Sequence, residues 1–260
     1  MMRAVISLSG GMDSTGLLMR LLADGYSVSC ISFNYGQKHV IELDRAMANI
    51  SYLAENDYFV EHRTVDLSST MGLFHSALTM GDLVVPEGHY ESEQMKQTVV
   101  PNRNAIFASI LYGYALSVAI REESEVAIAL GVHGGDHEIY PDCRPEFYEA
   151  VEHAFSVGNW NSELVSFHLP FLDGDKASIL IDAQEAVETL GLDFDTVFAN
   201  TITSYNPDVI GRSSGRSGAD VERILAFHAI GRADPIEYVD GWETALGNAL
   251  TTNEIHEASK

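Results

Sequence analysis

Residues 4–15 read AVISLSGGMDST, and residues 16–22 continue with GLLMRLL. An apolar run, a pair of glycines and a second apolar run follow one another, which predicts a strand, a tight turn and a helix. Gly10 and Gly11 let the backbone adopt angles that a Cβ atom forbids, so the N–H groups of the turn converge at the positive end of the helix. We therefore expect an anion at this turn, and a phosphate above all.

The polar side chains around these glycines strengthen that expectation. Ser9, Ser14 and Thr15 add hydroxyl donors, while Asp13 can cap the helix or help to hold Mg²⁺ beside the phosphates. An ordinary glycine turn with a Ser/Asp cap is the alternative. A Walker-type loop requires a lysine directly after its last glycine, and this stretch has none.

The pattern Ser-Gly-Gly-x-Asp-Ser resembles the PP-loop of ATP pyrophosphatases. The resemblance implies that ATP and Mg²⁺ bind here, and that the loop holds the β,γ-pyrophosphate as a leaving group while a substrate oxygen attacks the α-phosphorus. The implied chemistry is adenylation. The residues that it assigns to the phosphates are Ser9, Gly10, Gly11, Asp13, Ser14 and Thr15.

Composition predicts the class of protein and excludes some partners. The 260 residues are 46% hydrophobic, enough for one α/β core with a small C-terminal appendage. Fifteen basic against thirty-eight acidic residues give a net charge of -23, which repels a phosphate backbone, so we expect no nucleic acid as a substrate. No run of about 18 apolar residues and no signal peptide stand out, so a cytoplasmic enzyme without a membrane segment is expected.

Strand and helix patterns alternate along the chain. They predict a doubly wound parallel sheet in residues 1–195 and a C-terminal helical appendage in residues 196–260. The pattern weakens over residues 67–98, which predicts either a surface loop or a lid over the site. Residues 211–218, GRSSGRSG, predict a flexible loop. The predicted strands after the first are 26–33, 58–66, 125–130 and 164–168, and the predicted helices are 40–54, 104–120, 145–157 and 176–189.

Four further segments fall at predicted strand ends: FNYGQKH at 33–39, VPNRN at 100–104, GVHGGD at 131–136 and YPDCR at 140–144. With the PP-loop and PFLDGDKA at 170–177, they resemble the 7-cyano-7-deazaguanine synthase family of the queuosine pathway. The resemblance implies that ATP activates the carboxylate of 7-carboxy-7-deazaguanine, that ammonia displaces AMP to give an amide, and that a second ATP dehydrates the amide to the nitrile.

The resemblance also implies roles for single residues. Arg103, Arg144 and Lys176 are the cations expected to offset charge on the phosphates or the substrate carboxylate, with Arg103 and Lys176 joining Asp13 and Ser14 in catalysis. A carboxylate can accept both N–H groups on the pairing edge of a guanine-like base, so we expect Asp142, or alternatively Asp136, to read it. The residues expected to contact the nucleotide or the substrate are Phe33, Tyr35, Gln37, Asn104, Gly131 and Tyr140.

Four positions depart from the family pattern. Synthases of the family carry four zinc-binding cysteines in Thr-x-x-Cys-Tyr and Cys-Gly-x-Cys-x-x-Cys segments, whereas the corresponding positions here are Ser204, Ser214, Ser217 and Asp220. Hydroxyls stay protonated near neutral pH and bind zinc poorly. A structural zinc is therefore predicted to be absent, and only packing or a partner remains to order residues 206–218.

These features predict a carbon-nitrogen ligase that forms AMP and pyrophosphate from ATP and acts on a deazaguanine carboxylate with an amine donor. A homodimer is expected. The departures, which include Glu138-Ile139 where the family usually has Ser-Gly, leave two alternatives open. One is a zinc-free paralogue that transfers the acyl group to an amine other than ammonia, including one on a partner protein, in antiviral defence or nucleobase modification. The other is a nucleotide-binding module without catalysis.

Overall fold

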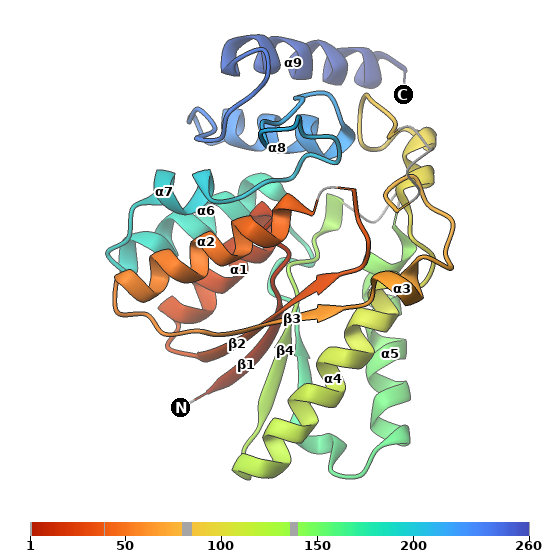
Figure 1. Cartoon of the computed structure of the whole chain (residues 1–260), viewed down its shortest axis with the longest axis vertical. Helices are drawn as coiled ribbons and strands as arrows, with labels where there is room; N and C mark the ends of the chain where they lie inside the picture. Colours follow the sequence, from red (N-terminus) through yellow and green to blue (C-terminus); the bar gives the residue numbers. More distant parts are fainter. Residues whose placement is uncertain (1, 39, 80–84, 136–139, 260) are drawn as a thin grey trace.

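A five-stranded parallel sheet forms the centre of the computed structural model, which describes residues 2–38, 40–79, 85–135 and 140–259 (Figure 1). The order β3-β2-β1-β4-β5 confirms the predicted doubly wound sheet. Successive strands are added on one side of β1 as far as β3 and then on its other side from β4. The crevice that binds ligands in such folds therefore lies beyond the carboxyl ends of β1 and β4. The strands are β1 (Arg3–Ser7), β2 (Ser27–Asn34), β3 (Glu61–Asp66), β4 (Val126–Ala129) and β5 (Val165–His168).

Helices cover both faces of this sheet. Side chains alternate along β1, so Ala4 and Ile6 enter one hydrophobic core while Val5 enters the other. The first core lies under α1, α2 and α6, and the second lies under α4 and α5. These helices are α1 (Met12–Ala23), α2 (Ile41–Glu55), α4 (Arg103–Glu122), α5 (Pro145–Gly158) and α6 (Lys176–Thr189).

Of the helices in the described residues, α4 alone is long and apolar enough to cross a membrane. Its side chains Leu111, Ala115 and Ala119 lie fully buried in the second core against the sheet. The apolar composition of α4 is that of a core helix in an α/β protein, because one side of such a helix packs against the sheet.

The C-terminal part adds α7 (Phe194–Ala199), α8 (Gly218–Ala229) and α9 (Trp242–Ser259). Figure 1 shows α8 and α9 as a layer of their own beyond the sheet and its helices. The expected boundary after residue 195 falls within α7, whose Phe198 packs in the first core. The division into two domains stays a prediction.

The segment between β3 and α4 contains two short elements, α3 (Ser68–Met71) and the 3₁₀ turn η1 (Glu93–Thr98). Residues 85–98 lie against the C-terminal layer: Gly88 donates a backbone hydrogen bond to Arg216 at 3.0 Å, and Glu87 pairs with Ser217. The stretch predicted as a surface loop or lid therefore joins the layer that contains α8.

Candidate active site at the carboxyl edge of the sheet

The turn between β1 and α1 depends on a glycine at position 10. Gly10 has φ of +83°, and a Cβ atom there would lie 1.9 Å from the backbone oxygen of Glu42 at the start of α2. Any other residue is therefore strained by its backbone angle and by this contact at the same time. Gly131 performs a related function after β4, because its Cβ would lie 3.1 Å from the backbone of Asp13.

The first turn of α1 has no side-chain cap among the described residues. By contrast, α6 and α8 begin with capping boxes built on Asp175 and Ser217. Beside the uncapped turn, the hydroxyls of Ser9 and Ser14 lie 3.0 Å apart, and the Ser9 hydroxyl accepts the Gly11 N–H at 3.1 Å. The N–H groups in the first turn of α1 are therefore not taken by a side-chain cap, which suits the expected anion.

A buried ionic cluster lies next to this turn. Lys176, the first residue of α6, donates to Asp13 Oδ2 at 2.7 Å and lies 3.2 Å from Glu222 Oε2. His133 Nε2 lies 3.0 Å from the same lysine nitrogen. Burial alone would raise the pKa of Asp13, but Lys176 and His133 together lower it below its ordinary value. Asp13 is therefore a carboxylate at neutral pH.

The second oxygen of that carboxylate fits a metal ion. Asp13 Oδ1 is buried and has no hydrogen-bond partner in the described part of the chain. A buried carboxylate oxygen without a partner is costly, and an oxygen ligand of this kind is what Mg²⁺ prefers. The donor set therefore fits the Mg²⁺ that accompanies ATP phosphates.

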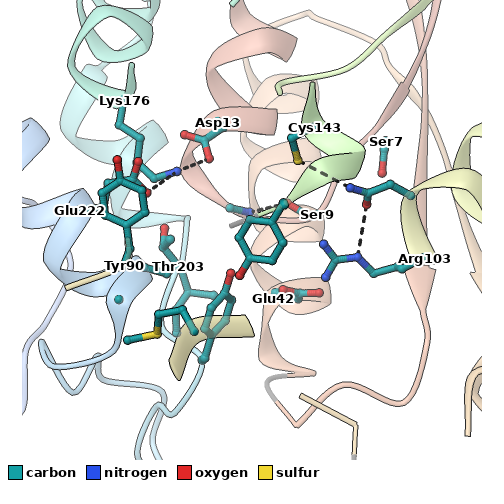
Figure 2. Close-up of a pocket in the computed structure, with 18 of the residues that line it drawn as sticks. Ser7, Ser9, Asp13, Glu42, Tyr90, Arg103, Cys143, Lys176, Thr203 and Glu222 are labelled. Carbon is teal, nitrogen blue, oxygen red and sulfur yellow. Dashed lines mark hydrogen bonds and ion pairs between the residues drawn. The ribbon is translucent and has the colours of Figure 1, made fainter. Parts of the chain in front are cut away.

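The opposite side of the pocket is formed by the start of α4. Arg103 directs its guanidinium toward the Tyr35 ring, 5.8 Å from the ring centroid, and its Nε donates to Asn104 at 3.3 Å. Burial alone would lower the pKa of Arg103, but nearby Tyr35 and other phenol groups raise it above its ordinary value. Figure 2 shows Lys176 and Arg103 on opposite sides of one pocket, each with its cationic end toward the interior.

This pocket and a smaller neighbour bring together most of the residues predicted for the site. Asn104 also lies 3.7 Å from the sulfur of Cys143, a buried free thiol that lines both pockets. The predicted residues that line the pocket are Ser9, Gly11, Asp13, Tyr35, Arg103, Asn104, Tyr140 and Lys176, and the neighbour adds Ser14 and Gly131.

Other predicted residues lie outside the pocket walls. Gln37 is buried and holds the end of β2, accepting from Tyr35 N–H and donating to Glu42. Phe33 lies behind the lining residue Phe107, with the two rings stacked at 4.1 Å. Gly10 lies in the turn and Thr15 is buried in α1, and neither lines the two pockets. Asp142 lies in the short turn η3 (Pro141–Cys143) and Arg144 follows it, and these two also lie outside both linings. Asp136 falls outside the described residues.

The sequence did not single out the wall that the C-terminal part supplies. The Ile202 N–H donates to Gly10 O at 3.0 Å, which joins this segment directly to the PP-loop. Glu222 belongs to the same wall and reaches Lys176. Two sequence signals fall in this wall, the Thr-x-x-Ser-Tyr frame at 201–205 and the segment from Ser214 to Asp220, and both predict only the loss of zinc ligands. The C-terminal lining residues are Ile202, Thr203, Tyr205, Gly218, Ala219 and Glu222.

The four substituted zinc positions meet around one carboxylate. Hydroxyls of Ser204, Ser214 and Ser217 donate to Asp220 Oδ2 at 3.0, 2.9 and 2.8 Å, and Ser213 donates to Oδ1. All but Ser214 are buried. The sequence predicted a flexible loop at residues 211–218, and the structure corrects this prediction. Side-chain hydrogen bonds to Asp220 order the segment, since a buried carboxylate requires several donors.

Comparison with known proteins identifies the family of this chain. The profile of the family described as Queuosine biosynthesis protein QueC matches residues 3–231. A 7-cyano-7-deazaguanine synthase from Methanoregula boonei is 43% identical over 237 residues, covering 91% of this chain and 99% of that protein. A second, from Marinomonas sp., is 41% identical over 238 residues, with 91% and 98% covered.

Among solved structures, the NMN synthetase from Francisella tularensis is similar with a TM-score of 0.39 and 14% identity, over 99% of this chain and 86% of that one. The PP-loop turn, the parallel sheet and the sequence match define a PP-loop ATP-using α/β enzyme. The chain belongs to the QueC family.

Proposed function

We propose that this protein uses ATP to adenylate the carboxylate of 7-carboxy-7-deazaguanine and then joins ammonia to the acyl group, as in 7-cyano-7-deazaguanine synthesis. The observation that carries the proposal is the Lys176–Asp13 pair beside the uncapped start of α1, with Arg103 across the same pocket. Cations and free N–H groups on both sides suit a negatively charged triphosphate and a negatively charged acyl substrate.

The first half-reaction forms a mixed anhydride. A carboxylate oxygen of the substrate attacks the α-phosphorus of ATP, and the bond to the β-phosphate oxygen breaks with release of pyrophosphate. The α1 turn and Lys176 would stabilise the departing charge, and Asp13 Oδ1 would hold Mg²⁺, which would supply positive charge to the phosphates. No enzyme nucleophile is needed, so the site acts by orientation and charge stabilisation.

The second half-reaction breaks the anhydride. The ammonia nitrogen attacks the acyl carbon, AMP departs with the bonding electrons, and a proton is lost to give the amide. The amide oxygen then attacks the α-phosphorus of a second ATP with release of pyrophosphate, and loss of AMP and two protons yields the nitrile. Arg103 is placed to hold the acyl or phosphate oxygens at this stage, since it reaches the pocket from the side opposite to Lys176.

We assign the base to the side of the pocket formed by Tyr35 and Tyr140. Burial, with nearby Glu42, raises the pKa of Tyr35, so its phenol stays neutral, and its ring lines the pocket beside Arg103 and edge-on to Phe107. The Tyr140 hydroxyl is held by Thr98 at 2.7 Å. Asp142 lies two residues after Tyr140 in the sequence. We propose that its carboxylate accepts the N–H groups on the pairing edge of the base.

A second candidate function follows from the C-terminal wall. Gly218, Ala219 and Glu222 line the pocket, and the start of α8 that carries them is held by Asp220 in place of zinc-binding cysteines. An altered wall suits an amine larger than ammonia, including one on a protein.

A module that binds nucleotide without catalysis is the third candidate, and the intact Lys176–Asp13 pair counts against it. We further propose a cytoplasmic homodimer that binds no nucleic acid.

Product analysis separates these candidates. The purified protein is supplied with ATP, Mg²⁺, 7-carboxy-7-deazaguanine and either ammonia or a panel of larger amines, and products are identified by mass spectrometry. We expect AMP, pyrophosphate and the amide or nitrile with ammonia. An amide formed only with a larger amine supports the second candidate, and nucleotide binding without any AMP supports the third. ADP and phosphate as products contradict the proposal.

A further inference from the structure

Two histidines and a glutamate meet at one point outside the pocket. His89 and Glu91 come from the segment before η1, and His256 comes from the last turns of α9. One ligand atom from each lies within 4.8 Å of the other two. His256 lies beyond the family match, which ends at residue 231, so this contact is formed by a part of the chain that the family profile does not cover.

The three potential ligands lie close together, although the two imidazole rings are stacked and are not turned toward a common ion. His256 Nε2 lies 2.8 Å from Glu91 Oε2, and the rings of His89 and His256 stack with centroids 3.8 Å apart and planes 6° apart. His89 is buried, with 6% of its surface exposed, while the side chains of His256 and Glu91 are 16% and 23% exposed. The group is therefore constrained but still reachable from solvent.

We propose that His89, Glu91 and His256 form a binding site for a divalent transition metal ion of the zinc class. Imidazole nitrogens and a carboxylate are the ligands that such ions select, and two histidines with one glutamate leave a fourth position for water. In a tetrahedral site with bonds of about 2.0–2.1 Å, ligand atoms lie about 3.4 Å apart, so the ion would draw the ligands closer and turn the stacked rings until both imidazole nitrogens face it.

A simple ion pair explains only part of this arrangement. A pair between His256 and Glu91 requires two side chains, yet His89 brings a third potential ligand to the same point. The proposed site uses none of the substituted zinc positions around Asp220.

The expected consequence is a clamp between two elements. Within α9 the only buried hydrophobic side chains are Ala245 and Ala249, both in its first half. Figure 1 shows the C-terminal end of α9 next to the gold segment before α4. An ion at His256 would fasten this end to the segment, and Tyr90, which lies between His89 and Glu91, lines the active-site pocket. The proposal stands independently of the proposed function.

The test uses metal-free full-length protein titrated with Zn²⁺ by calorimetry, with Co²⁺ absorption as a second readout of the ligand set. We expect one Zn²⁺ per chain with a Kd in the micromolar range or below, and a rise in Tm when it binds. The variants His256→Ala and Glu91→Gln should each weaken binding at least tenfold. His153→Ala, which removes an exposed histidine on α5, is the matched control and should bind as the parent does.

Circular dichroism establishes that each variant is folded, and His256→Gln replaces His256→Ala if the alanine variant is not. Absence of stoichiometric Zn²⁺ binding by the parent protein would overturn the proposal. Binding that persists at full strength in both the His256 and the Glu91 variant would overturn it as well, because the ion would then lie elsewhere.

Discussion

The starts of α1 and α8 face the same pocket, yet they use their polar groups in opposite ways. At α8, Ser217 caps the helix and Asp220 collects hydroxyl donors from four serines. At α1, no described side chain caps the helix, and Asp13 Oδ1 has no partner. Polar groups that are satisfied internally maintain a structure, whereas buried groups left without a partner indicate where a ligand binds.

The first way to break this comparison is to remove the cation from the α1 side. Lys176→Met should lower release of AMP and pyrophosphate by about 10²-fold to 10³-fold, because one charged contact to the leaving group is lost. Asp13→Asn removes the charge of the lysine's ion-pair partner, and Ser14→Ala removes a hydroxyl of the α1 turn, so both should also slow the reaction. The rate of AMP formation is measured in stopped assays.

Lys96→Met is the control, since this lysine is exposed and paired only with exposed Glu93. It should retain parental activity. Equal activity of Lys176→Met and the parent would contradict the assignment of this side of the pocket to the pyrophosphate.

The second prediction concerns stability at the α8 side. Asp220→Ala leaves several buried hydroxyls without their acceptor, so the free energy of unfolding should fall by about 3 kcal/mol or more. Chemical denaturation measures this change. In the His256→Ala background, a chelator should leave the unfolding midpoint unchanged, because Asp220 and not zinc orders this segment.

Asp195→Ala serves as the control for Asp220. It breaks an exposed ion pair with Arg232 and should cost less than about 1 kcal/mol. A chelator that lowers the midpoint of the His256→Ala protein would show that a metal still binds near the serines.

The sequence predicted the fold well. Repeating strand and helix patterns are local, so the doubly wound parallel sheet and the helix that starts at Lys176 could be anticipated. Glu222 could not be found in this way, because its contact with Lys176 depends on how α8 packs over the pocket. Asp220 was recognised as a lost zinc ligand, but its role as an acceptor for four serines is a property of their positions in space.

The third prediction sharpens the comparison by testing a residue near the pocket but outside its walls. Asp142→Asn replaces one acceptor by an amide donor that would face the N–H groups of the base. Affinity for the carboxylated base should fall by about 30-fold to several hundred-fold, while affinity for a non-hydrolysable ATP analogue should change little. Calorimetry with each ligand separately measures both.

Equal weakening of both ligands, or of neither, would mean that Asp142 supports the turn η3 and that another residue reads the base. Asp136 is then the next residue to replace. Asp142→Glu is the matched variant, because it retains the charge and should recover part of the affinity for the base.

The smallest expected effect is a pH dependence that belongs to Asp13. Its folded-state pKa lies below the ordinary value of 3.8, because the effect of Lys176 and His133 outweighs that of burial. The folded protein therefore holds fewer protons at this carboxyl than the unfolded chain, and the contribution to stability is fully present above the unfolded pKa. It is lost as the pH falls through the lower folded pKa.

The difference in unfolding free energy between the parent and Asp13→Asn should thus stay constant above about pH 5 and shrink below pH 4. Denaturation series at several pH values measure it, in the absence of ATP and Mg²⁺. A difference that grows on acidification would mean that burial dominates at Asp13, and the contrast between a charged α1 side and a satisfied α8 side would fail at its central residue.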